Sequence, residues 1–453
     1  MKTFNSSFGF WGSEVGLALC IVASLLAVLF NNITFYLFVS VLYLAVIARW
    51  AHISFFTVFS VITVFTLLQT WIQATTGHAS GMIYNNQAGV PLYEGIHGLC
   101  TISFMLTMLL FLRFTNVIKN EKLIYRSKTI CPEYLAIILL ILSCVIMFVM
   151  FPSLPTFTLN AETRRSQGLF SSYGWVLIGL LLATFSTDYV DRHKSIYIAY
   201  FFLIFWSIGH GERVEVMGFA VFLVLKLANN SVKNSNFSSK KGIGNIKLKN
   251  LLLVFAGFLF ILLMVFIGVY RMRGEGVYVD LTVPELFRLT FSQSTAGDVV
   301  YVFDCAVDMM VHGNLLFGKT YFDWIAQLVP GMDSGISAAV VIQDYYYTVG
   351  GAQFFVEPMM NFGLFGILIT NITFCALYSF LLSRKNSPLA SMMFYPMVIE
   401  IFRTAWYGRN GWVLTSCVVM PALYLLLNLV STNKFPSLPF DKRDGVLNNS
   451  NFH

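Results

Sequence analysis

Long apolar segments alternate with short polar ones along most of the chain. About twelve of the apolar segments approach the roughly 20 residues that an α-helix needs to cross a bilayer. Only helices and closed barrels satisfy all their backbone hydrogen bonds within lipid, so the pattern predicts an all-α polytopic membrane protein. The expected spans lie near residues 13–31, 33–49, 51–73, 96–113, 134–152, 173–190, 196–210, 214–230, 251–270, 354–382, 389–403 and 411–431.

One connection, residues 271–353, is far longer than most others and mixes polar with aromatic residues. Long ordered loops between membrane helices usually have a function of their own. We therefore expect a single integral membrane domain over 1–453. Within it, 271–353 forms a large helical outer loop and 432–453 forms a cytoplasmic tail.

Composition excludes a soluble domain. Hydrophobic residues make up 57% of the chain and charged residues 11%, against about 25% charged residues in soluble domains, and the mean hydropathy is +0.72. The net charge of +7 does not indicate a nucleic-acid partner, because cytoplasmic loops of membrane proteins carry excess Lys and Arg. The seven cysteines show neither metal-ligand spacing nor an evident disulfide pair.

The distribution of Lys and Arg predicts the orientation. If the N-terminus is inside, most of these residues fall in inner segments, so both termini are expected in the cytoplasm and the large loop in the periplasm. Among the outer cations, all but Lys319 are Arg. The planar guanidinium fork grips phosphate or carboxylate through two hydrogen bonds, so this bias favours an anionic ligand at the outer surface.

The first candidate site is the stretch 209–215, which contains Glu212, Arg213 and Glu215 at the outer start of a predicted span. A helix N-terminus attracts anions, and an Arg there suits a phosphate with a carboxylate nearby. The alternative is a tight capped turn with an arginine anchored at the interface.

Further outer arginines are candidate substrate contacts, and each has the same alternative as an interfacial anchor or solvated charge. Glu400 and Arg403 are one helical turn apart and are able to pair. The adjacent Trp406 suits an interfacial aromatic belt. These candidates are Arg403, Arg409, Arg271, Arg273, Arg164 and Arg165.

A general base has two more candidates near or in the loop. Glu357 follows the point where the loop re-enters an apolar segment, where it serves either as a base or as the partner of an arginine. His312 lies within the loop and is the histidine alternative. Gly363 and Gly366, just beyond Glu357, permit close helix packing.

The layout of spans, the late outer loop, the outer arginine at 213 and the pattern Glu-x-x-x-x-Phe-Gly-x-x-Gly beginning at Glu357 together resemble the O-antigen polymerases (the Wzy family). They also resemble the wider set that includes the O-antigen ligases. In the resemblance, Arg213 matches the family's outer-helix arginine, and Arg271 with Arg273 match its loop-edge arginines.

This resemblance implies a GT-C-like fold and a metal-independent inverting glycosyltransferase with no cofactor. It implies that undecaprenyl-diphosphate-linked glycans are donor and acceptor at the periplasmic face of the bacterial inner membrane. A polysaccharide chain-length regulator is the implied protein partner.

Such a reaction makes two chemical demands. The diphosphate leaving group needs positive charge, which arginines supply, and the acceptor hydroxyl needs a base, for which Glu212, Glu215 and Glu357 compete. The rival hypotheses are an O-antigen ligase, a flippase or transporter of lipid-linked glycans, and a metal-dependent mannosyltransferase. A transporter favours midplane charges and paired halves, and a metal-dependent enzyme favours an acidic first outer loop, where this chain has Asn31 and Asn32.

Overall fold

The computed structural model is helical throughout its described part, and no strand occurs within these residues. It describes residues 4–51, 54–76, 90–115, 280–286, 295–326, 338–348, 351–384, 387–408 and 414–432, together with short pieces at 141, 145, 205, 216–218, 220–222, 225, 259, 262–263 and 266–269.

Seven of the predicted spans coincide with described helices. The N-terminal ones are α1 (Phe4–Phe30), α2 (Ile33–Ala51), α3 (Phe55–Thr76) and α4 (Glu94–Phe114). The C-terminal ones are α17 (Val356–Ser383), α18 (Pro388–Ile399) with α19 (Ile401–Tyr407), and the π-helix η4 (Leu414–Val419) with α21 (Met420–Thr432). Among the described helices α2, α3, α4 and α17 are long and apolar enough to cross a membrane.

The prediction of an all-helical membrane protein is confirmed at this level, whereas twelve spans and a GT-C arrangement stay predictions. Spans 134–152, 173–190 and 196–210 lie almost entirely outside the described residues. The predicted span 389–403 is two helices: α18 ends at Ile399 and α19 starts at Ile401. Pro396 lies inside α18 and has no amide hydrogen to donate to the carbonyl four residues before it.

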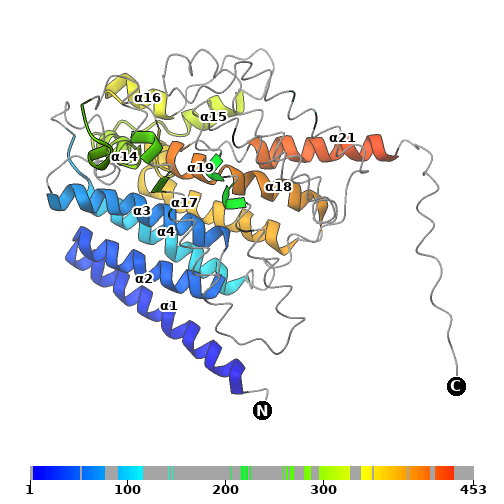
Figure 1. Ribbon diagram of the computed structural model, residues 1–453, viewed down its shortest axis with the longest axis horizontal. Coiled ribbons are helices and arrows are strands. Elements are labelled where there is room, and N and C mark those ends of the chain that lie inside the picture. The colour runs from blue at the N-terminus through cyan, green and yellow to red at the C-terminus, as the bar shows by residue number, and fades with distance from the viewer. Residues whose placement is uncertain are drawn as a thin grey trace.

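Three more helices lie within 271–353: α14 (Thr295–Val311), α15 (Lys319–Ala326) and α16 (Ala338–Tyr345). In Figure 1 they gather at the upper left, and α14 packs on both α3 and α17. Residues on every side of α14, such as Val299, Val300, Tyr301 and Val302, are buried. A helix buried all round is part of a protein core, so this segment of the loop is a structural layer of the molecule.

The first four helices form an antiparallel bundle. The α1–α2 turn uses Asn31 at φ 45°, a conformation that asparagine tolerates better than most residues. α2 crosses α4 closely because Gly98 has no side chain: a Cβ there would lie 2.2 Å from the Tyr36 ring. At the other end of α4, Arg113 pairs with Glu14 of α1. Each end of α4 is thus fixed to a neighbouring helix.

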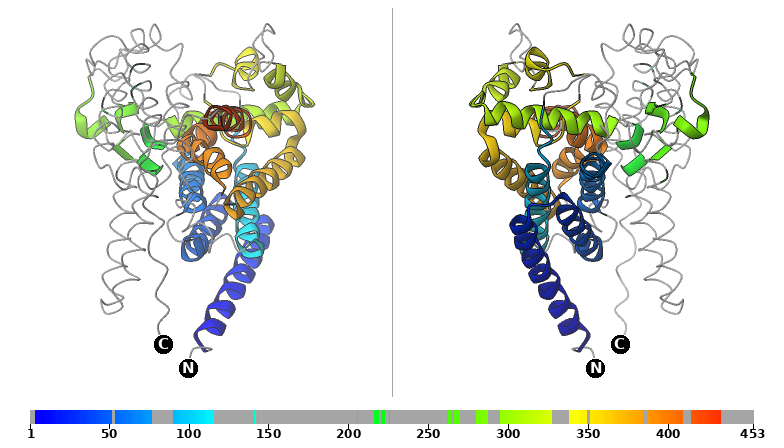
Figure 2. Two further views of the ribbon diagram at one scale, coloured as in Figure 1. Left: turned by 90° about the vertical axis from the view of Figure 1, so that its right-hand side faces the viewer. Right: turned by 90° about the vertical axis from the view of Figure 1, so that its left-hand side faces the viewer.

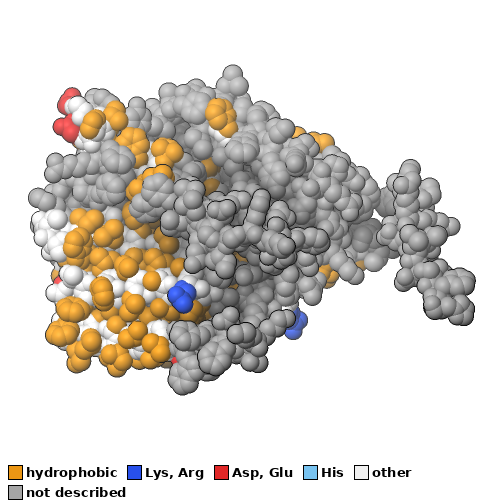
Figure 3. All heavy atoms as spheres, turned by 60° about the horizontal axis from the view of Figure 1, so that its bottom comes forward, with side chains coloured by type: hydrophobic (Ala, Val, Ile, Leu, Met, Phe, Trp, Pro, Cys, Tyr) orange, Lys and Arg blue, Asp and Glu red, His pale blue; other side chains and the backbone are white. Residues whose placement is uncertain are grey.

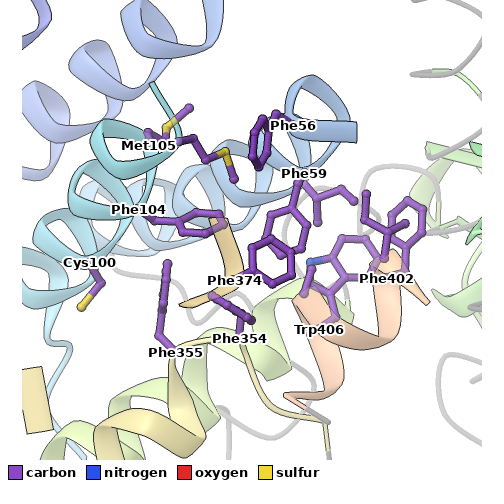
Figure 4. Packing of buried hydrophobic residues seen from close by; sticks show 14 of the residues in the cluster. Phe56, Phe59, Cys100, Phe104, Met105, Phe354, Phe355, Phe374, Phe402 and Trp406 are labelled. Carbon is purple, nitrogen blue, oxygen red and sulfur yellow. The ribbon is translucent and has the colours of Figure 1, made fainter. Parts of the chain in front are cut away.

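An aromatic cluster joins this bundle to the C-terminal helices (Figure 4). The ring centroids of Phe59 and Phe104 are 5.2 Å apart, and those of Phe354 and Phe374 are also 5.2 Å apart. Phe59 and Phe354 link the two pairs at 5.6 Å. Each such contact adds about 0.5–1.5 kcal/mol beyond area burial. The end of the large loop, which supplies Phe354, is therefore part of the core.

The outward faces of α1 and α2 are apolar. Figure 3 shows hydrophobic side chains covering this side of the molecule, and Leu29 is 78% exposed. Neighbours on the same helices, Leu25 and Phe38, are also largely exposed. Soluble monomers rarely expose continuous apolar patches beyond a few hundred Å². This surface is suited to lipid, as expected of a membrane-embedded protein.

Candidate functional site

The end of the large loop meets the segment that follows α18. The Ala352 amide donates a hydrogen bond to the Trp406 carbonyl at 3.0 Å, and the Phe354 amide donates to the Ala405 carbonyl at 3.1 Å. Gly408 allows the approach: its φ is +56°, and a Cβ would lie 3.0 Å from that of Ala352. Residues 352–354, at the loop re-entry, and residues 405–406 of α19 are therefore held together by main-chain hydrogen bonds.

Just beyond this contact, α17 bends sharply at Phe362 and Gly363, the latter with φ 62° and ψ −148°. A Cβ on Gly366 would lie 2.3 Å from the Pro358 carbonyl oxygen. Residues eight apart in a straight helix are separated by about 12 Å along its axis, so the arm 356–361 folds back against the rest of α17. Figure 2 shows this bend in the gold helix. The Phe-Gly-x-x-Gly pattern encodes it.

Asn361 fixes the folded-back arm to the start of α15. Its side-chain nitrogen donates to Thr320 Oγ1 at 2.7 Å and to the Glu357 carbonyl at 2.8 Å, and its oxygen accepts from the Gly318 amide at 2.9 Å. An asparagine whose amide has partners on both atoms and is fully buried specifies one arrangement. The sequence signal for it was slight: an Asn one position before the Phe-Gly pair.

Glu357 lies in this arm, at the loop re-entry as expected, and is only 8% exposed. It is close enough to Tyr321 of α15 that its charge, together with the stronger effect of burial, raises the pKa of that phenol. The Tyr321 ring in turn stacks on Phe362, with centroids 6.3 Å apart. The structure thus combines a nearly buried carboxylate with aromatic rings of the kind that sugars stack on.

Glu400 and Arg403 lie at the α18–α19 junction, and each has a contact outside the predicted pair. Glu400 Oε1 accepts a hydrogen bond from Thr415 at 2.9 Å, and the Arg403 guanidinium lies 5.9 Å from the Tyr407 ring centroid. The prediction for Trp406 is wrong. It is buried, and its indole N–H donates to Thr66 at 3.1 Å, because α19 packs inward on α3.

His312, expected to be an isolated loop histidine, is part of a polar cluster at the end of α14. Its Nδ1 lies 2.8 Å from the Asp308 carbonyl and 3.5 Å from the Asp308 carboxylate. That carboxylate also accepts hydrogen bonds from Tyr93 at 2.7 Å and Tyr346 at 2.6 Å. Two oxygen neighbours favour a hydrogen on Nδ1, which leaves the Nε2 lone pair of this mostly exposed ring as an acceptor.

Asp304, one turn earlier in α14, was not singled out from the sequence. It is fully buried, and one oxygen accepts the Tyr93 amide hydrogen at 3.0 Å. The other oxygen has no hydrogen-bond partner within the described part of the chain. Burial raises the pKa of Asp304 well above its ordinary value. Burial, followed by the hydrogen bond to Asp308, raises the pKa of Tyr93 to about 12.

The remaining predicted site residues lie outside the described residues. Gly218, shortly after the candidate stretch 209–215, is described and lies close to α18: a Cβ on it would lie 1.6 Å from the Ile399 carbonyl oxygen. The ring of Phe222 contacts Tyr395 at 5.4 Å. Gly218 and Phe222 therefore lie along α18 in antiparallel order. The undescribed candidates are Glu212, Arg213, Glu215, Arg271, Arg273, Arg409, Arg164 and Arg165.

Two further features bear on ligands. An apolar groove of about 510 Å³ is lined by Leu259, Leu262, Leu263, Phe266, Val283 and Pro284. Within the described ranges, no three His, Cys, Asp or Glu side chains gather closely enough to hold a metal ion.

None of the available protein-family models matches the chain, and no curated protein or solved structure is significantly similar to it. The class of protein rests on the chain's own features: a helical, membrane-embedded protein in which part of a long loop is built into the core.

Proposed function

We propose that this protein polymerises undecaprenyl-diphosphate-linked oligosaccharide repeat units into O-antigen at the periplasmic face of the bacterial inner membrane, with both termini in the cytoplasm. The observation that carries the proposal is the burial of Glu357 at the loop re-entry, in the bent arm of α17 and close to Tyr321 of α15. A carboxylate kept from bulk water beside aromatic rings is suited to removing the proton from an acceptor sugar hydroxyl.

The leaving group in this reaction is a lipid diphosphate, and arginines stabilise its developing charge without a metal. Arg213, Arg271 and Arg273 are the proposed ligands, together with Arg403 at the α18–α19 junction. The contact between Gly218 and Ile399 supports this grouping, because Gly218 follows Arg213 by five positions and Ile399 directly precedes Glu400. A guanidinium fork that faces a phosphate stabilises the transition state more than the point charge of a lysine does.

The lipid part of the donor needs an apolar surface. The 510 Å³ groove is lined by residues on both sides of Arg271 and Arg273 in the sequence, 259–266 before them and 283–284 after them. An isoprenoid chain in this groove would bring its diphosphate towards the proposed arginines. The chain-length regulator remains the proposed protein partner.

The alternative is the ligase reaction, which transfers the glycan to the lipid A core. The geometry of His312 favours it, because Asp308 orients the ring with Nε2 outward, as a histidine base requires. The two reactions predict different essential bases, Glu357 for polymerisation and His312 for ligation.

Deletion of the gene followed by analysis of surface glycan separates these functions. Loss of a polymerase leaves the core capped by a single repeat unit, whereas loss of a ligase or flippase leaves the core without repeat units.

Substitutions then test the site. Glu357→Gln and Arg213→Lys should each abolish long glycan at normal protein level. For Arg213→Lys, the activation free energy should rise by about 3–4 kcal/mol, which lowers the rate by about two to three decades. Arg49→Lys, near the predicted cytoplasmic end of α2, should be silent. Wild-type glycan length in Arg213→Lys and Arg271→Lys would show that these arginines are membrane anchors.

A further inference from the structure

His97 occupies a position where four parts of the chain meet. It belongs to the first turns of α4 and is fully buried. Its Nδ1 lies 2.6 Å from Thr70 Oγ1 of α3, and its Nε2 lies 2.7 Å from Gln353 Nε2 at the end of the large loop. The ring also contacts Phe303 of α14, with centroids 4.7 Å apart.

The chemistry of these contacts defines one form of the ring. An amide nitrogen only donates, so Gln353 donates to the lone pair of His97 Nε2. The ring hydrogen is then on Nδ1 and is donated to Thr70. A neutral imidazole is well suited to this task, because it offers an acceptor and a donor on separate edges. The Gln353 oxygen has no partner within the described residues, so His97 is the contact that the structure gives this amide.

Gln353 lies in the segment that connects the loop end to α19 and to Glu357. Its two neighbours, Ala352 and Phe354, donate the main-chain hydrogen bonds to Trp406 and Ala405. Four residues further on is Glu357. The side chain of Gln353 therefore supplies a hydrogen bond through which α4 holds the loop end that leads to the proposed base, next to the aromatic contacts of Phe354.

We propose that His97 is a positioning residue: through Gln353 it holds the loop end against α19 and thereby sets the place of Glu357. The tether itself is independent of any reaction, whereas its effect on turnover rests on the proposed polymerase function.

Two amide substitutions separate the contacts of the ring. From the same Cβ, an asparagine amide reaches the position of Nδ1, whereas a glutamine amide reaches that of Nε2. His97→Asn therefore retains the Thr70 contact and loses Gln353, and His97→Gln does the reverse. Gln353→Leu removes the tether from its other side, so the test does not depend on one variant folding.

The first measurement is hydrogen exchange at the Ala352 and Phe354 amides of the detergent-solubilised full-length protein. His97→Asn and Gln353→Leu should each speed this exchange about tenfold or more, and the double variant should add little, whereas His97→Gln stays near wild type. Tyr43→Phe is the matched control, because it removes a partly buried 2.9 Å hydrogen bond to Ser24 between α1 and α2, away from the loop. Equal exchange in His97→Asn and His97→Gln, or wild-type exchange in His97→Asn, overturns the tether.

The second measurement is polymerisation of lipid-linked repeat units by the same proteins. A misplaced base should lower kcat about tenfold or more in His97→Asn with little change in the acceptor KM, and His97→Gln should restore it. Fast exchange in His97→Asn with wild-type kcat overturns the positioning role. An inactive wild-type protein overturns the proposed function, and the exchange measurement still decides whether His97 tethers the loop.

Discussion

The bend in α17 should be abolished or strained by one methyl group, in the variant Gly366→Ala. The added Cβ would lie 2.3 Å from the Pro358 carbonyl oxygen and 3.0 Å from the Phe362 Cβ. Neither obstacle is the end of a flexible side chain. To reach the 3.4 Å of an ordinary contact, the arm 356–361 must move away by about 1 Å, and Glu357 moves with it.

Two opposing terms set the effect on stability. Alanine favours a helix over glycine by about 1 kcal/mol, whereas an overpacked site typically costs about 1–3 kcal/mol. The net loss of stability is therefore about 0–2 kcal/mol. The effect on rate should be larger, because a displacement of about 1 Å at a catalytic group can cost about 10²-fold. Glycan polymerisation should fall much further than the amount of folded protein.

The matched control is Gly16→Ala in α1, where a Cβ would lie 3.5 Å from Val46, an ordinary contact. That substitution should be neutral or slightly stabilising. Thermal unfolding of both purified variants and the chain length of the surface glycan are the two measurements. Wild-type polymer and wild-type melting temperature in Gly366→Ala would refute the tight bend and the role given to it.

Three further substitutions test the packing around the site. Burial raises the pKa of Asp304, so the native state keeps a proton that the unfolded chain loses. Stability therefore falls as the pH rises from about 4 through the raised pKa. In Asp304→Asn, the melting temperature should depend less on pH over that range. Tyr346→Phe removes a 2.6 Å hydrogen bond to Asp308 and should cost about 1 kcal/mol, seen as faster hydrogen exchange in α16. In Gly98→Ala, the new Cβ would lie 2.2 Å from the Tyr36 ring, so the melting temperature should fall by the equivalent of about 1–3 kcal/mol. Adding Tyr36→Ala should restore part of that loss.

The membrane helices were accessible to sequence reasoning because their signal is local. The predicted spans 33–49 and 354–382 correspond to α2 (Ile33–Ala51) and α17 (Val356–Ser383). A run of apolar residues of bilayer length has few alternatives to a helix in lipid. The helices of the large loop have no such constraint on length. The burial of α14 depends on its contacts with α3 and α17, which no pattern within α14 itself predicts.

The candidate site was less accessible because its contacts join distant parts of the chain. Asp304 meets Tyr93 across 211 positions, and His97 meets Gln353 across 256. A single histidine in an apolar segment, such as His97, is by sequence alone indistinguishable from an ordinary core residue. Its spacing to other polar residues carries no information until the fold places α4 beside the end of the loop.

The glycines beyond Glu357 were recognised, but only one of them acts as expected. Small residues at 363 and 366 were expected to let two helices pack closely, as such pairs do between membrane helices. Gly363 does so, since a Cβ there would lie 3.3 Å from the Met310 sulfur of α14, whereas Gly366 makes its close approach within α17, to Pro358. What decides between these outcomes is the backbone at Gly363, whose φ of 62° is open to glycine at little cost and strained for most other residues. A spacing pattern describes which residues are small, whereas the direction of the chain depends on which of them must adopt a positive φ. Glu357 therefore reaches its enclosed position through the bend at Phe362 and Gly363.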